Sequence, residues 1–123
     1  MRVERIAHVF VDEIPESLDE GVLYIAIEYG TATHRCYCGC GNEVVTPITP
    51  NDWSLIYDGE TVSLHPSVGN WSFDCRSHYW IRKGVVRWAL PWSDEEIAEN
   101  RERDMHRKRR FFAFRGTANE ETD

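Results

Sequence analysis

Hydrophobic and polar positions alternate over short segments in the first three-quarters of the chain, a pattern typical of β-strands. Residues 22–29 are the strongest such segment, because they are almost continuously β-branched, aliphatic or aromatic. A strand that is apolar on both faces is buried on both, so we place it in the middle of a sheet. Weaker patterns predict a strand within residues 1–12 and a short one at 44–46.

The clearest hairpin lies at residues 53–65. Two β-prone runs, 53–57 and 61–65, flank the pair Asp58-Gly59, and an Asp-Gly pair favours a tight hairpin turn. After the hairpin we predict a loop at residues 66–71 and a strand at 72–81. A turn then leads to a last predicted strand at residues 85–90.

The pattern changes after Pro91. Ser93 followed by Glu96 is a capping box, which predicts the start of a helix that runs from about residue 94 to 110. Residues 116–123 are polar and predict a disordered acidic tail. We therefore predict a mostly β protein, bordering on α+β: one small antiparallel β domain over residues 1–115 with one C-terminal helix.

Composition restricts the function. With 41% hydrophobic residues the chain has enough apolar surface to fold as a globular domain. Its net charge of −7 argues against nucleic acid as a partner, although the basic run 107–110 lies beside three phenylalanines. We find no secretory signal and no membrane-spanning segment, so we expect the cytoplasm, where clustered cysteines bind metals more often than they form disulfides.

Three cysteines occupy alternate positions in a segment that also contains two glycines. They are Cys36, Cys38 and Cys40, and the fourth, Cys75, is far away in sequence. Along a straight strand these side chains would be about 6–7 Å apart, too far to share one ion. Gly39 and Gly41 can adopt positive φ and fold the segment into a tight turn. We therefore predict that the four cysteines hold one zinc ion, which staples the β domain.

Two ligand sets remain open at this stage. In one, all four cysteines close a structural zinc site and His78 has another role. In the other, the chain bends at Ser77, and His78, with or without His34, joins two or three thiolates. Thiolate-rich, closed sites are structural, whereas a catalytic zinc keeps an open position, so the first set is favoured. The cysteines could also be buried without any metal.

Ser67 and His78 are the leading candidates for hydrolytic chemistry if the zinc is structural. Ser67 lies in a glycine-containing loop and would be the nucleophile, with Ser77 as the other candidate. His78 or His34 would be the base, and Asp74 would orient the histidine.

Two further residues, Asn70 and Trp71, are predicted to bind the substrate backbone. A catalytic zinc would instead use Glu43 or Asp74 as the base, but the chain has no His-Glu-x-x-His motif. The zinc-dependent metallopeptidase therefore has less support.

Three motifs together resemble those of a small bacterial family encoded in ubiquitin-like conjugation operons. The resemblance covers roughly residues 22–97, and the motifs are His34-x-Cys36-x-Cys38-Gly39-Cys40-Gly41, Pro66-Ser67-Val68-Gly69-Asn70-Trp71 and Cys75-Arg76-Ser77-His78-Tyr79-Trp80-Ile81. It implies a peptidase that trims a ubiquitin-like precursor or removes the ubiquitin-like protein from its targets. The implied partners are that protein and its conjugation enzymes.

The five tryptophans suggest a second class of function, in which the chain binds a partner without catalysis. A small core does not need so many, and exposed aromatic residues are typical of interfaces. The alternative is thus a non-catalytic, zinc-stapled module that binds a ubiquitin-like protein or its conjugating enzyme.

Overall fold

The computed structural model describes residues 2–89, 95, 97–106 and 108. The chain divides into two compact units, Met1–Pro91 and Trp92–Asp123, and each is described by itself. In the second unit the described residues are helical, as predicted, and Lys108 pairs with Asp104 one turn earlier, at 3.5 Å. Within the described part of the chain, no helix is both long enough and apolar enough to cross a membrane. The proposed cap Ser93 and the tail 116–123 lie outside the described residues.

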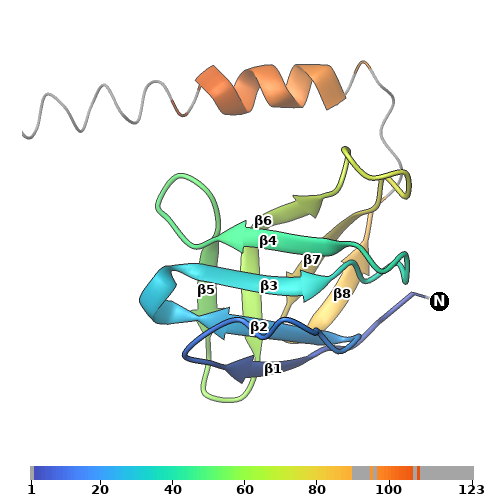
Figure 1. Cartoon of the computed structure of the whole chain (residues 1–123). Coiled ribbons are helices and arrows are strands. Elements are labelled where there is room, and N and C mark those ends of the chain that lie inside the picture. Colours follow the sequence, from blue (N-terminus) through green and yellow to red (C-terminus); the bar gives the residue numbers. More distant parts are fainter. Residues whose placement is uncertain (1, 90–94, 96, 107, 109–123) are drawn as a thin grey trace, which may run out of the picture. The chain divides into compact units, whose positions relative to one another are not determined.

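The first unit contains two four-stranded sheets (Figure 1). In the first sheet the strands follow one another in chain order, with β1 parallel to β2 and the other pairs antiparallel. The predicted central strand is confirmed, but it ends at Ala26 rather than at Tyr29, because the next three residues form a short 3-10 helix that Gly30 ends in a left-handed conformation. The elements are β1 (Ala7–Phe10), β2 (Val22–Ala26), η1 (Ile27–Tyr29), β3 (Thr31–Arg35) and β4 (Glu43–Pro47).

The second sheet is an antiparallel meander that begins with the predicted hairpin. The carboxylate of Asp58 holds its turn by accepting hydrogen bonds from the backbone N–H groups of Glu60 and Thr61. Two predictions are wrong here: residues 66–69 continue a strand instead of forming a loop, and residues 72–77 form turns instead of a strand. The strands are β5 (Ser54–Tyr57), β6 (Val62–Gly69), β7 (His78–Arg82) and β8 (Val85–Trp88).

The two sheets pack against each other through one hydrophobic core. It contains Leu23 and Ile25 from the first sheet and Leu64, Tyr79 and Ile81 from the second, all fully buried. Isolated bridges also link Arg5, which precedes β1, to Val85 of β8, and Ile48, which follows β4, to Trp53, which precedes β5. The mostly β fold with one C-terminal helix is therefore confirmed, while a single domain over residues 1–115 stays a prediction.

Candidate functional site

Ser67 lies in an irregular part of β6. Leu64 pairs with Ile81 and Val68 pairs with Tyr79, so residues 65–67 together lie opposite Trp80 alone. Such a bulge bends a strand and redirects its side chains, and bulges are common beside functional sites. Ser67 is half-buried, and its carbonyl accepts a hydrogen bond from Nε1 of Trp53 at 3.3 Å. The Ser67 hydroxyl therefore projects from a bulged segment of backbone that the hydrogen bond from Trp53 helps to fix.

His78 is the first residue of β7 and lies directly opposite Gly69 in the strand pairing. Ser67 is two residues before Gly69, so Ser67 and His78 are diagonal neighbours on one face of the sheet. Nε2 of His78 is 2.8 Å from Oγ of Ser67. Burial lowers the pKa of His78, which favours the neutral imidazole that can accept the hydroxyl proton. The structure thus brings together the two residues that the sequence indicated first.

Two tryptophan rings flank the His78 imidazole. Trp71 contacts it edge to face, with ring centroids 5.0 Å apart, and the Trp80 ring is tilted against it at 5.2 Å. Trp71 folds back over Gly69, where a Cβ atom would lie only 2.6 Å from the indole Nε1. The missing side chain at residue 69 therefore makes room for the indole that packs on the histidine.

Replacing Gly69 with alanine is expected to push Trp71 off His78 and to reduce the stability by about 1–3 kcal/mol, a typical cost of overpacking. Urea unfolding measures the loss, and the indole N–H resonance of Trp71 reports the displaced ring. In a Trp71→Ala background the same change should cost almost nothing, because the clashing atoms are gone. An equal cost in both backgrounds would mean that the clash is not the cause.

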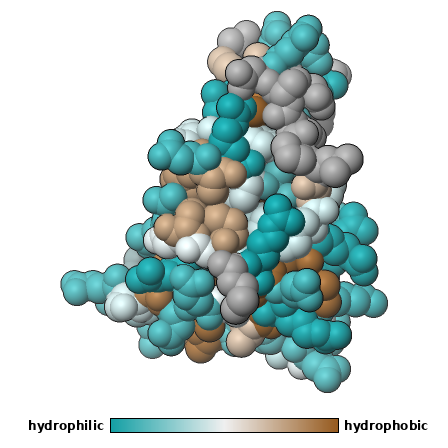
Figure 2. All heavy atoms as spheres, turned by 90° about the vertical axis from the view of Figure 1, so that its right-hand side faces the viewer, coloured by the Kyte–Doolittle hydropathy of each residue, from teal (hydrophilic) through white to brown (hydrophobic). Residues whose placement is uncertain are grey.

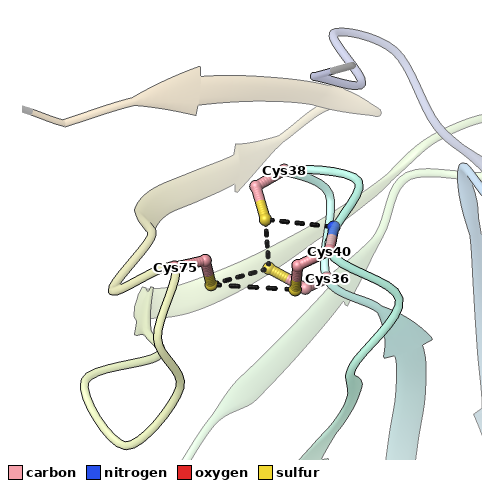
Figure 3. A group of neighbouring side chains, drawn as sticks. All are labelled: Cys36, Cys38, Cys40 and Cys75. Carbon is pink, nitrogen blue, oxygen red and sulfur yellow. Dashed lines mark hydrogen bonds between the residues drawn. The ribbon is translucent and has the colours of Figure 1, made fainter.

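The four cysteines form one cluster, with their sulfur atoms pointing toward a common centre (Figure 3). All four Sγ atoms lie within 4.8 Å of one another, and none forms a disulfide. Gly39 and Gly41 have φ values of 92° and 86°, which confirms the predicted turn. Cys40 is exposed. The β3–β4 and β6–β7 connections lie on the right-hand side of Figure 1. Figure 2 shows this side, and hydrophobic and hydrophilic residues are interspersed on it.

Sulfur spacing tests whether this cluster fits a metal ion. The Sγ–Sγ distances are 3.4 Å for Cys36–Cys38, 3.8 Å for Cys36–Cys75 and 3.7 Å for Cys40–Cys75. A tetrahedral ion with metal–sulfur bonds of about 2.3 Å needs ligands about 3.8 Å apart. The four thiols can therefore hold one ion, and the cluster does not include His78 or His34.

A buried polar network lies next to the thiols. Nδ2 of Asn70 is 3.0 Å from Oγ of Ser77, 3.5 Å from Sγ of Cys36 and 3.4 Å from the hydroxyl of Tyr79. The hydroxyl of Ser77 is itself 3.0 Å from Sγ of Cys36. Asn70, which the sequence suggested as a substrate ligand, is thus engaged inside the protein. Ser77, the second candidate nucleophile, is engaged in the same way.

His34, the second candidate base, belongs to the core. Its Nε2 lies 2.7 Å from the hydroxyl of Tyr79, and its ring stacks on Tyr37 with centroids 4.3 Å apart. Complete burial lowers the pKa of His34 to about 3. No hydrogen bond joins it to Ser67 or His78 among the described residues, so it is not brought to that pair.

Asp74 is exposed in the turn before β7, and no hydrogen bond or ion pair links this described residue to His78. Sequence reasoning missed Trp80 and Trp53. Trp80 could have been found, because it lies two residues after His78 on the same strand and therefore on the same face. Nothing in the local sequence indicates that Trp53 binds the Ser67 carbonyl.

A comparison with known protein families gives a match over most of the first unit. Residues 10–89 match the model of a family described as bacterial ubiquitination-like system serine protease (BubE). The matched span includes Ser67, His78 and all four cysteines. No curated protein and no solved structure gives a significant match.

Proposed function

The chain belongs to this family of serine proteases of bacterial ubiquitination-like systems, and on that premise we propose that it is a peptidase that processes or removes a bacterial ubiquitin-like protein. The observation that most directly supports this proposal is the 2.8 Å contact between Nε2 of His78 and Oγ of Ser67. A serine hydroxyl is a weak nucleophile until a base accepts its proton, and this contact supplies that base.

In the proposed reaction Ser67 attacks the scissile carbonyl while His78 takes the hydroxyl proton. The tetrahedral intermediate collapses to an acyl-enzyme when His78 gives that proton to the leaving amine. Water, deprotonated by His78 in the same way, then attacks the ester and releases the carboxylate product and free Ser67. Each half of the reaction uses the same two side chains.

The imidazole must keep its orientation through both proton transfers. In a serine–histidine–aspartate triad a buried carboxylate provides that orientation. Here Trp71 and Trp80 pack against the ring of His78. We propose that these indoles hold the ring and shield it from bulk water, while a role for Asp74 remains a prediction.

We propose that the cysteine cluster holds a structural Zn²⁺ ion. Four thiolates complete a tetrahedral shell and leave no position for a substrate or water, which disfavours a metallopeptidase. The ion would offset half of the negative charge of the four thiolates and tie Cys75, in the β6–β7 turn, to the β3–β4 connection. Asn70 and Ser77 would donate hydrogen bonds to the Cys36 thiolate, as outer ligands commonly do.

Cleavage should depend on pH through His78. The base must be neutral, so kcat/KM should rise as the pH increases through the pKa of His78 and then level off. Burial lowers the pKa of His78, so we expect the midpoint of this acid limb below the ordinary value of about 6.5. Thermal unfolding at each pH controls for loss of the fold. A midpoint above 6.5 would contradict the proposed base.

The direct test uses a bacterial ubiquitin-like protein with a short C-terminal extension. The purified chain is mixed with it, and the products are identified by mass spectrometry. A single cut at one defined peptide bond is expected. If the ubiquitin-like protein is retained on a column of the immobilised chain but is never cut, the chain is a binding module and the peptidase proposal fails.

A further inference from the structure

One face of the second sheet carries both the Ser67–His78 pair and positively charged side chains. Leu64, Val68, Tyr79, Ile81 and Val86 point into the core, so the alternate residues lie on the other face. Trp80 pairs with Arg87 on the neighbouring strand, and Arg82 follows Trp80 on the same side of β7. We call this surface the Ser67 face, and it includes Ser67, His78, Trp80, Arg82 and Arg87.

Charge is distributed unevenly along the first unit. Residues 62–89 contain four Lys or Arg and one Asp, a net charge of +3, whereas residues 2–61 contain three Arg and eleven Asp or Glu, a net charge of −8. Arg82 and Arg87 are exposed, and neither forms an ion pair with any residue that the structure describes. The Ser67 face is therefore a local cationic surface on an acidic protein.

We propose that the Ser67 face binds an acidic segment of the protein substrate, with Arg82 and Arg87 contacting carboxylates on one side of the scissile bond. The proposal rests on the peptidase function above and adds the substrate's chemistry. His78 and Arg82 are four residues apart on β7, a distance of about 13 Å at the strand rise. An extended substrate of the same rise would therefore place the carboxylate that meets Arg82 about four positions from the cut, and the one that meets Arg87, which lies opposite Trp80, about two positions from it.

A protein segment fits this surface better than a nucleic acid does. Binding a phosphate backbone requires many cations along a groove, and the rest of the unit would repel a long polyanion. Two arginines beside an indole are enough to select a short acidic peptide. At physiological salt the screening length is about 8 Å, so the preference should weaken as salt increases.

The test compares two fluorescent peptide libraries with the same random central positions. In one library the four flanking positions on each side are Glu, and in the other they are Gln. Binding is measured by fluorescence anisotropy at low and high salt, and cleavage is measured separately on the same libraries. We expect the wild-type chain to bind the Glu library about tenfold more tightly at low salt, as two exposed ion pairs would allow.

The variant Arg82→Gln/Arg87→Gln should lose this preference. Its matched control is Ile27→Glu/Tyr29→Glu, which changes the net charge by the same amount at two exposed positions of η1, the 3-10 helix between β2 and β3. The control should keep the preference. Equal binding of both libraries by the wild type, or loss of the preference in the control as well, would overturn the proposal.

The two proposals fail in different ways. If the Glu library is preferred but neither library is cut, the acidic-segment proposal stands and the peptidase proposal is weakened. Single-stranded RNA serves as a competitor. If it displaced the Glu library and bound more tightly through Arg82 and Arg87, the surface would be a nucleic-acid site and the proposal would be wrong.

Discussion

Replacing Ser67 with alanine is expected to reduce cleavage of a ubiquitin-like substrate by at least about 10³-fold, the scale seen when a serine protease loses its nucleophile. The Oγ atom of Ser67 lies 2.8 Å from Nε2 of His78, so the substitution removes the hydroxyl that is positioned for the attack. The fold should survive, because the half-buried hydroxyl contributes one hydrogen bond, a net stabilisation of about 1 kcal/mol. Product formation is measured by mass spectrometry, and thermal unfolding is measured in parallel.

Ser54→Ala is the matched control, because Ser54 is an exposed serine on the adjacent strand β5. It should cleave at the wild-type rate. A fluorophosphonate probe gives a second readout that needs no substrate: it should label Ser67 in the wild type and much more slowly in His78→Gln. Normal cleavage by Ser67→Ala, or labelling of a different serine, would rule out the proposed nucleophile.

The sequence predicts an element well when the interactions that form it join residues that are close in sequence. The hairpin around Asp58 and Gly59 was predictable because a tight turn fixes the pairing of the residues beside it. The bulge at residues 65–67 was not, because it arises from pairing with β7, which begins nine residues after β6 ends. The same pairing turned the expected loop at 66–69 into a strand and removed the expected strand at 72–77.

The site was predictable where chemistry limited the choice of residues. Cysteines that alternate around two glycines have few arrangements other than a shared ion, so the cluster followed from composition and turn geometry. Ser67 and His78 also followed from residue type. Asn70 and His34 are the same kinds of polar residue, yet both are buried in a network around Tyr79. What separates them from the Ser67–His78 pair is the hydrogen-bond partner that each side chain meets, and those partners are set by the whole fold.

Removing the proposed zinc ion is expected to have the second large effect. Binding of zinc to a structural site in a small domain contributes about 10–16 kcal/mol, comparable with the whole net stability of a domain, about 5–15 kcal/mol. Cys75 lies in the turn that leads into β7, and β7 begins with His78. Chelation or Cys75→Ser should therefore lower the unfolding temperature strongly and abolish cleavage together. Ser72→Ala, an exposed change in the same turn, should affect neither.

Exchanging the ion distinguishes a structural from a catalytic role, which chelation alone does not. Cadmium also prefers thiolate ligands, and it would fill the same four positions with slightly longer bonds. If the ion only fixes the turn, the cadmium protein should regain both its unfolding temperature and cleavage within about threefold of the zinc protein, because no step of the reaction touches the metal. If the ion activates water, cleavage should instead fall far more than stability, since the identity of a catalytic metal sets the pKa of its bound water. The second result would overturn the assignment of the reaction to Ser67 and His78 alone.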